Sequence, residues 1–299
     1  MRATIFDCDP GIDDSFALFL ISKMNIKIDY FVATFGNSSQ KNTKRNLEIM
    51  TEYLSLDGEI VSGCECSLNG LFPEGGDFHG KDGLADIAFE MEKKFQPKRR
   101  AVIDYKALSE KLSECDEIVY YAVGPLTTLA SIIDYRSELK NKIKNVFVMG
   151  GGLKIFNKEF DTEYNFYSDG LSVKKVFESG MKITIFPLDL TMISGLKKSD
   201  IDEIEKSGQY PEMITMLKYN FDKNCSFGSD SAILHDTLPV LYSAFPDKFK
   251  IEETELFADE NGHIERLQNS NRINVATAME KDLLARCLKK FFQNGDNYE

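Results

Sequence analysis

The stretch ATIFDCDPGIDDSFAL, residues 3–18, begins as an apolar strand, turns at a Pro-Gly pair and continues as an apolar helix. A strand that passes directly into a helix is the building unit of a parallel, helix-covered sheet. Four carboxylates lie at this junction. Asp7 and Asp9 share one side of the strand by its period of two. Asp13 and Asp14 fall in the first helical turn, where the helix dipole favours anions. The stretch therefore predicts an α/β fold with negative charge concentrated after its first strand.

The alternation of apolar strands and amphipathic helices continues along the chain. Buried strands are predicted at Ala3–Phe6, Tyr30–Phe35, Ile118–Val123, Val146–Met149 and Ile183–Leu188. Crossover helices are predicted at Asp13–Met24, Asn42–Leu56, Pro125–Tyr135 and Leu171–Gly180. The turn signal at residues 259–262 predicts a hairpin of Ile251–Phe257 and His263–Leu267, followed by a last helix at Ala278–Phe292. We expect one domain over residues 1–299, a doubly wound, mostly parallel sheet flanked by helices, with inserted loops and a C-terminal hairpin.

The charge balance excludes several classes of partner. With 48 acidic against 36 basic side chains, the formal net charge of −12 repels a phosphate backbone, so we expect no nucleic-acid polymer as a partner. The six cysteines show no Cys-x-x-Cys pair, which favours reduced thiols in a cytosol. The N-terminal residues lack a signal-peptide pattern, and no apolar run approaches the roughly 20 residues that cross a bilayer. These features predict a cytoplasmic protein without a membrane partner.

The four clustered carboxylates would repel one another and resist ionisation unless something compensates their charge. A hard cation with oxygen ligands is the simplest compensation. The plain alternative, in which single carboxylates cap the helix or serve the turn, leaves the others unexplained. An EF-hand loop starting at Asp7 is excluded, because Ile12 stands where that loop needs Gly and Leu18 where it needs Glu. An Asp-x-Asp after the first strand is also found in haloacid dehalogenase-type phosphatases, which remain the rival enzyme class.

The segment Asp7-Cys8-Asp9-Pro10-Gly11-Ile12-Asp13-Asp14 resembles the signature of the inosine-uridine-preferring nucleoside hydrolases. Further matches to that family follow in order along the chain. They are Gly36-Asn37, His79-Gly80-Lys81-Asp82-Gly83-Leu84, Val123-Gly124-Pro125-Leu126-Thr127, Met149-Gly150-Gly151-Gly152, Asn157 with Glu163-Tyr164-Asn165, Leu188-Asp189-Leu190-Thr191 and His235-Asp236-Thr237-Leu238-Pro239. Any one of these motifs is weak, but their ordered succession is specific.

The resemblance implies an enzyme that depends on Ca²⁺ and cleaves the N-glycosidic bond between ribose and a base. It assigns the calcium to the carboxylates of Asp9, Asp14 and Asp236 and to the main-chain carbonyl of Thr127, with a water and two ribose hydroxyls completing the shell. Asp9 would also be the general base on that water. The implied ribose contacts are Asp13, Asn37, Asn157, Glu163 and Asn165, and the implied loop supports are Asp7 and His79.

His235, beside Asp236, is the general acid that the resemblance implies, because a departing base is a poor anion unless it is protonated. Considered alone, the pair could simply open a helix, with Asp236 as its cap. The substrate would be a small ribonucleoside, cleaved in nucleoside salvage, and we expect a homodimer or homotetramer. The identity of the released base stays open, and a deazaguanine is among the candidates, because the base would be contacted by the variable stretches Phe72–Phe78 and Tyr219–Asp230. A calcium-dependent nucleoside-binding protein without activity is the non-enzymatic alternative.

Overall fold

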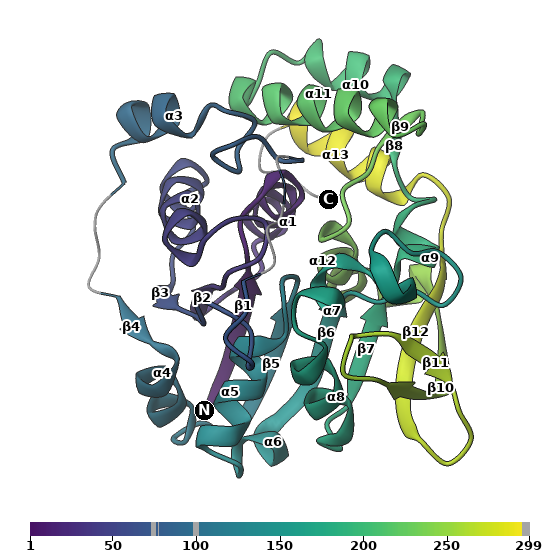
Figure 1. Cartoon of the computed structure of the whole chain (residues 1–299). Helices are drawn as coiled ribbons and strands as arrows, with labels where there is room; N and C mark the ends of the chain where they lie inside the picture. Colours follow the sequence, from purple (N-terminus) through teal and green to yellow (C-terminus); the bar gives the residue numbers. More distant parts are fainter. Residues whose placement is uncertain (73–75, 77, 98–101, 295–299) are drawn as a thin grey trace.

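A single large sheet organises the molecule (Figure 1). The computed structural model describes residues 1–72, 76, 78–97 and 102–294. Among these residues the sheet has ten strands, in the spatial order β11 (Ile264–Arg266), β10 (Phe249–Ala258), β12 (Asn271–Met279), β7 (Ile183–Phe186), β6 (Ile143–Met149), β5 (Glu117–Ala122), β1 (Arg2–Cys8), β2 (Tyr30–Ala33), β3 (Glu59–Ser62) and β4 (Ile103–Asp104). A separate antiparallel pair is formed by β8 (Leu196–Lys197) and β9 (Ser231–Ala232).

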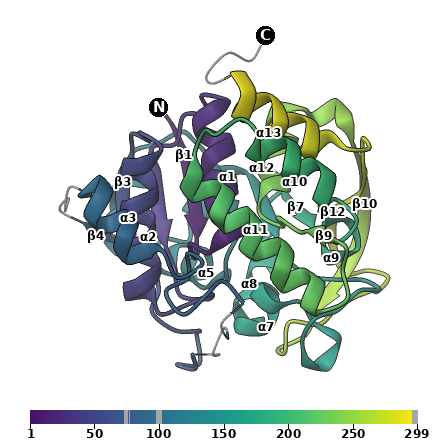
Figure 2. The same cartoon turned by 90° about the horizontal axis from the view of Figure 1, so that it is seen from above.

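Helices cover both faces of this sheet, and each face has its own hydrophobic core. The first core packs beneath α1 (Ile12–Lys23), α2 (Gln40–Tyr53), α3 (Ala88–Phe95), α10 (Lys198–Glu205), α11 (Pro211–Ser226), α12 (Thr237–Ala244) and α13 (Leu283–Asn294). The second packs beneath α4 (Tyr105–Leu112), α5 (Thr127–Tyr135), α6 (Leu139–Lys142), α7 (Tyr164–Ser168) and α8 (Gly170–Glu178). Figure 2 shows α11 and α13 lying across one side of the molecule. The short helix α9 (Leu188–Thr191) follows β7, and 3₁₀ turns occupy Glu159–Asp161 and Pro246–Lys248.

The strand order confirms the predicted doubly wound architecture. From β1 the chain moves outward through β2, β3 and β4, then returns to the other side of β1 and continues through β5, β6 and β7. Neighbours from β4 to β12 pair in parallel, whereas β10 pairs antiparallel with both β12 and β11. The sheet is therefore mostly parallel, as expected. Within the described residues every helix falls short of what a membrane crossing requires in length and apolar character.

The C-terminal part differs from the prediction in two ways. The predicted last helix, Ala278–Phe292, was placed too early, because Asn271–Met279 forms β12 and α13 begins only at Leu283. Ile273 and Val275 are buried on one side of β12, a period-two pattern typical of a strand. The hairpin is also not an appendage, since β12 pairs in parallel with β7 and thereby joins β10 and β11 to the main sheet.

Two predicted strands are shorter than expected at their carboxyl ends. The strand predicted to reach Phe35 ends at Ala33, and the strand predicted to reach Leu188 ends at Phe186. Pro187 follows β7 and precedes α9. Because proline has no N–H for the ladder, it ends the strand there.

Candidate active site

The acidic stretch after β1 lies where the sheet changes its winding direction. β1 pairs with β2 on one side and with β5 on the other. The helix after β1, α1, covers one face of the sheet, whereas the helix after β5, α5, covers the opposite face. In doubly wound folds ligands bind at this switch point, outside the carboxyl ends of the strands. The fold therefore places Asp9, Asp13 and Asp14 where a binding site is expected.

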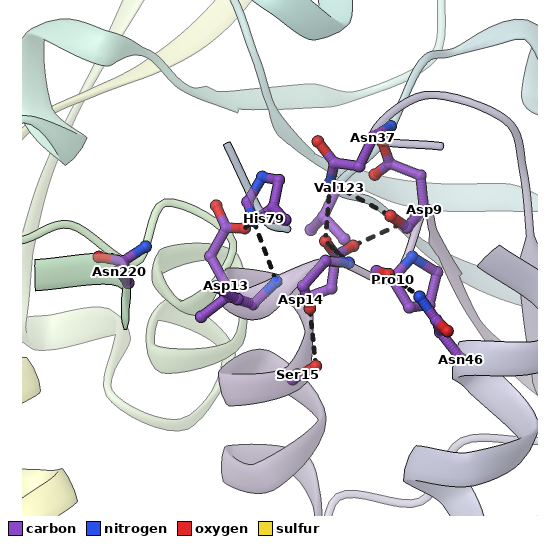
Figure 3. Close-up of polar contacts among 12 residues, drawn as sticks. Asp9, Pro10, Asp13, Asp14, Ser15, Asn37, Asn46, His79, Val123 and Asn220 are labelled. Atoms are coloured by element: carbon purple, nitrogen blue, oxygen red, sulfur yellow. Dashed lines mark hydrogen bonds and ion pairs between the residues drawn. The ribbon is translucent and has the colours of Figure 1, made fainter. Parts of the chain in front are cut away.

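Three buried carboxylates converge at this point. Oxygens of Asp13, Asp14 and Asp236 all lie within 4.8 Å of one another, and Figure 3 shows the two α1 members together. Burial raises the pKa of Asp14 to about 7, and repulsion from Asp13 adds to the shift. Burial, followed by the charges of Asp13 and Asp14, also raises the pKa of Asp236 well above its ordinary range. The resemblance assigned Asp13 to the ribose, whereas the structure includes it in the carboxylate cluster.

Asp9 lies beside this cluster and is closely enclosed. Its Oδ2 accepts a 2.7 Å hydrogen bond from the backbone N–H of Asn37, while its buried Oδ1 has no hydrogen-bond partner among the described residues. A Cβ at Gly36 or Gly124 would approach these carboxylate oxygens to 2.0 or 2.7 Å, so both positions need glycine. Burial raises the pKa of Asp9 well above its ordinary range, and the charge of Asp14 adds to the shift. Without a compensating cation, this carboxylate is expensive to ionise.

Asn37 and Asp14 fix the loop that carries Asp9. The Nδ2 of Asn37 donates to the main-chain oxygen of Asp9 at 3.1 Å and to Oδ2 of Asp14 at 3.2 Å (Figure 3). Asp14 also accepts hydrogen bonds from the backbone N–H groups of Asp9 and Gly11, at 3.2 and 2.9 Å. Asn37 thus reaches the site that the resemblance assigns to it. Its contact with ribose stays a prediction.

Glu163 and Asn165 lie at the amino-terminal end of α7, Glu163 as its N-cap residue and Asn165 in its first turn. Glu163 caps α7 by accepting the N–H of Asn165 at 2.9 Å, and it also accepts the N–H of Gly151 at 3.0 Å. Burial raises the pKa of Glu163 to about 7. The amide of Asn165 donates to the main-chain oxygens of Val123 and Met149, at 2.9 and 3.1 Å, and so ties together the ends of β5 and β6.

Asn157, another predicted ribose contact, lies in an exposed loop. Its side chain is exposed, and its backbone N–H donates to the main-chain oxygen of Thr162 at 3.1 Å. The isolated bridge between Lys158 and Thr162 holds this part of the loop together. Asn157 is therefore positioned by a loop rather than by the sheet, and its contact with ribose stays a prediction.

Asp7 is buried one strand step behind Asp9 and is held by a tyrosine. The hydroxyl of Tyr120, on β5, donates to Oδ2 of Asp7 at 2.7 Å. Burial raises the pKa of Asp7 to about 8, and the Tyr120 hydrogen bond opposes that shift. This contact links β1 to β5 below the site, which agrees with the supporting role that the resemblance implies.

The motif at residues 123–127 places Val123 and Thr127 at the junction between β5 and α5. Thr127 lies in the first turn of α5, and its hydroxyl donates to Asp169 at 2.6 Å. Val123 instead follows β5 directly, its N–H donates to the main-chain oxygen of Asp7 at 2.9 Å, and it appears among the site residues in Figure 3. The main-chain oxygen of Thr127 as a ligand of the ion stays a prediction.

Both predicted histidines lie at the site. Nδ1 of His79 accepts the backbone N–H of Ile12 at 3.1 Å and lies 3.7 Å from Oδ1 of Asp13. Nδ1 of His235 lies 2.7 Å from the hydroxyl oxygen of Thr191. Burial lowers the pKa of both imidazoles, and the charge of Asp13 opposes the shift in each. His79 thus contacts the start of α1, and His235 lies next to Asp236 in the chain. The supporting role of His79 and the acid role of His235 stay predictions.

The aromatic residues of the variable stretches separate into core and surface positions. Tyr219 and Phe221, on α11, are partly buried against the first hydrophobic core. Phe227, at the end of α11, is 78% exposed and stacks on Phe78 with ring centroids 6.1 Å apart. Phe78 also contacts His79, with a centroid distance of 5.1 Å. Phe78 and Phe227 therefore adjoin the site, while positions 73–75 and 77 of the stretch Phe72–Phe78 lie outside the described residues.

Asn220 is a site residue that the sequence did not single out. It lies on α11, is fully buried, and points toward Asp13 in Figure 3. Asn224 donates to its Oδ1 at 2.9 Å, which leaves the amide nitrogen of Asn220 directed away from Asn224 and without a hydrogen-bond partner among the described residues. Two amide residues four positions apart on a helix are also common without a function, so no sequence signal separates Asn220 from an ordinary helix residue.

The donor set fits a hard cation. Oδ1 atoms of Asp7, Asp9 and Asp13 are buried without a hydrogen-bond partner among the described residues, and at least Asp9 and Asp13 adjoin the carboxylate cluster. Carboxylate and carbonyl oxygens are the ligands that calcium and magnesium prefer, and the atoms that lie within 4.8 Å of one another in the cluster are all carboxylate oxygens. The arrangement thus defines a doubly wound α/β protein with an acidic, cation-type site at its switch point.

Comparisons with known proteins agree with this class. The family model of the inosine-uridine preferring nucleoside hydrolases matches residues 4–285. Uridine nucleosidase 1 of Arabidopsis thaliana is 32% identical over 255 residues, which are 82% of this chain and 74% of that protein. The pyrimidine-specific ribonucleoside hydrolase RihA of Klebsiella pneumoniae is 27% identical, over 82% of this chain and 80% of its own. The solved purine-preferring ribonucleoside hydrolase from Gardnerella vaginalis has the same fold, with a TM-score of 0.86 at 18% identity over 98% of both chains.

The chain belongs to the inosine-uridine preferring nucleoside hydrolase family, whose members are enzymes that cleave N-glycosidic bonds. This membership confirms the resemblance drawn from the ordered motifs and the prediction of a hydrolase. It also removes the phosphatase alternative, since the family match covers nearly the whole chain.

Proposed function

We propose that this protein hydrolyses the N-glycosidic bond of a ribonucleoside with the help of one Ca²⁺, releasing ribose and a free base for salvage. The observation that carries the proposal is the buried cluster of Asp13, Asp14 and Asp236 beside the unpartnered oxygen of Asp9. Such a cluster lacks compensation in the protein alone. A nucleoside-binding protein without activity would need the cation but neither a base nor an acid, and Asp9 and His235 are candidates for these two roles.

The ion would be held by Asp9, Asp14 and Asp236 and by the main-chain oxygen of Thr127, with Asp13 at its edge. When bound, Ca²⁺ supplies positive charge that keeps these carboxylates ionised and fixes oxygen ligands of substrate and solvent. Asp13, Asn37, Asn157, Glu163 and Asn165 would contact the ribose hydroxyls. Of these, Asn37 donates a hydrogen bond to Asp14 of the cluster, and Asn165 donates one to the main-chain oxygen of Val123 at the end of β5.

The reaction needs one proton acceptor and one proton donor. Asp9 removes a proton from the attacking water while the water oxygen forms a bond to the anomeric carbon of ribose. The bond from that carbon to the base nitrogen breaks, and its electron pair leaves with the base. His235 donates a proton to the base, so that the products are ribose and a neutral base. The carboxylates around the ribose also favour the positive charge that develops on its ring in the transition state.

We further propose a pyrimidine ribonucleoside such as uridine as the substrate class. The support is the name of the 32% identical relative, a uridine nucleosidase, and that of the pyrimidine-specific relatives. Phe78 and Phe227, stacked beside His79, offer the base an aromatic surface. The cytoplasmic location and the homodimeric or homotetrameric assembly stay predictions.

A reducing-sugar assay over a panel of nucleosides and nucleotides tests this proposal. We expect release of ribose from uridine and loss of that activity when a chelator removes the metal, with recovery on addition of Ca²⁺. Elemental analysis should find about one calcium per chain. Activity that persists without metal, or a stoichiometric transition metal in place of calcium, would contradict the proposal.

The raised carboxylate pKa values predict how the stability of the metal-free protein depends on pH. Asp14 and Asp7 ionise near pH 7 and 8 when folded, against 3.8 as the ordinary value. The folded state therefore binds more protons than the unfolded state across this interval, so stability is highest below it and falls as pH rises through it. We expect Tm of the metal-free protein to fall by several degrees from about pH 5.5 to about pH 8.5.

Calcium should reverse this loss, because the ion replaces the protons that the cluster otherwise retains. The increase in Tm on adding Ca²⁺ should therefore be largest at the alkaline end, as measured by thermal unfolding. Asp14→Asn should weaken both the slope and the calcium response. The matched control Asp134→Asn removes an exposed carboxylate of α5, paired with Lys175, and should change neither. A metal-free Tm that is flat with pH and insensitive to Ca²⁺ would contradict the assignment.

A further inference from the structure

Thr191 holds the ring of His235 through a contact that the motifs do not reveal. The two residues are 44 positions apart, and the hydroxyl oxygen of Thr191 lies 2.7 Å from Nδ1 of His235. Thr191 is the last residue of α9 and only 1% exposed, and its N–H donates to the main-chain oxygen of Pro187 at 3.1 Å. The hydroxyl is therefore anchored to the short helix that follows β7, and a β-branched side chain has little rotamer freedom there.

The chemistry of a hydroxyl explains what this contact can do. A hydroxyl can donate its one proton or accept one, so it can pair with Nδ1 whether or not that nitrogen carries a proton. Nε2 is then the nitrogen of His235 that remains free to exchange a proton. His235 precedes Asp236 in the chain, and the carboxylate of Asp236 lies in the cluster with those of Asp13 and Asp14.

The neutral ring has a preferred tautomer in this arrangement. If Nδ1 carried the proton, it would donate to Thr191, and the buried Thr191 hydroxyl would have no acceptor among the described residues. A buried donor left without an acceptor costs about 1–3 kcal/mol. If instead Thr191 donates to Nδ1, both groups are satisfied and the proton of the neutral ring is on Nε2.

We propose that Thr191 is a positioning residue for His235: its hydroxyl occupies Nδ1, orients the ring and reserves Nε2 for the proton that passes to the leaving base. This inference rests on the proposed function for its consequence in catalysis. The contact itself and the tautomer do not depend on that function.

Two substitutions and a control isolate the hydroxyl. Thr191→Val keeps the branched shape and removes the hydroxyl, whereas Thr191→Ser restores a hydroxyl at the same position. Thr51→Val is the matched control, because Thr51 on α2 is also buried and its hydroxyl donates to the main-chain oxygen of Leu47 at 2.9 Å. The control measures the general effect of losing a buried threonine hydroxyl in a helix.

The direct readout is the ¹⁵N NMR spectrum of the imidazoles in histidine-labelled protein, with His235 assigned by its loss in His235→Ala. In the wild type at a pH where the ring is neutral, we expect Nδ1 without a proton and Nε2 with one. Thr191→Val should give mixed tautomers or a changed ring signal, while Thr191→Ser and Thr51→Val should retain the wild-type pattern. A neutral wild-type ring with its proton on Nδ1, or an unchanged His235 signal in Thr191→Val, would overturn the inference.

The kinetic readout separates positioning from general damage. Thr191→Val should lower kcat for uridine by about tenfold or more, yet leave hydrolysis of p-nitrophenyl riboside within about threefold, since a phenolate needs no protonation. Thr191→Ser should stay within about threefold of the wild type on both substrates. Equal losses on both substrates would overturn the positioning role. A changed tautomer in Thr191→Val with unchanged uridine hydrolysis would also overturn the positioning role. If His235→Ala also hydrolyses uridine at the wild-type rate, then His235 is not the acid, and it is the proposed function that fails rather than the contact with Thr191.

Discussion

Asp9→Asn is expected to lower kcat for ribonucleoside hydrolysis by about 10²–10⁴-fold, or roughly 3–5 kcal/mol, while the fold is retained. The substitution removes the proton acceptor but keeps the shape of the side chain, so its oxygen can still accept the backbone N–H of Asn37. Gly36 and Gly124, which enclose the carboxylate, accommodate an amide of the same size. The loss is therefore expected in the chemical step rather than in folding.

Calcium content must be measured beside the rate, because Asp9 is proposed to hold the ion as well as to accept the proton. Asp29→Asn is a suitable control. Its carboxylate accepts the backbone N–H of Thr4 at 2.9 Å, which is comparable to the bond made by Asp9, but it precedes β2 at the amino end of the sheet. The control should retain both calcium and activity. Near-normal turnover in Asp9→Asn that is fully loaded with calcium would refute the role of Asp9 as the base.

The first strand and its carboxylates could be predicted from the sequence because their signals are local. The apolar run before Asp7 and the Pro-Gly turn before Asp13 fix a strand, a turn and a helix start within one short segment. The strand β12 was missed for the opposite reason. Its pairing with β7 joins segments about 90 residues apart, and its alternating pattern is interrupted where Val275 and Ala276 are both buried.

For the site, the sequence motifs predicted which segments of the chain take part. The motif at residues 123–127 located the junction between β5 and α5. The contact between Thr191 and His235 and the orientation of Asn220 toward Asp13 arise from packing between distant elements. Neither residue type nor spacing carries that information in a single sequence.

His235→Ala is expected to separate two substrates that differ in their leaving groups. A natural base leaves reluctantly as an anion, so its protonation in the transition state contributes roughly 10²–10⁴-fold to the rate. The phenolate of a p-nitrophenyl riboside is already a stable leaving group, whereas its ribose makes the same demands on Asp9 and the carboxylate cluster. We therefore expect a strong loss of uridine hydrolysis and a change within about tenfold, or roughly 1.4 kcal/mol, for the phenyl riboside.

The control for this prediction is His263→Ala, which removes the histidine of the C-terminal hairpin. Nδ1 of His263 lies 2.9 Å from the main-chain oxygen of Asp161, and His263 is not part of the carboxylate cluster, so the ratio of the two rates should stay near that of the wild type. An equal loss on both substrates in His235→Ala would instead indicate damage to the neighbouring Asp236 and hence to the cation site, which calcium analysis would reveal. Little loss on either substrate would show that His235 is not the acid and has only a structural role at the start of α12. The base would then obtain its proton from another group or from solvent.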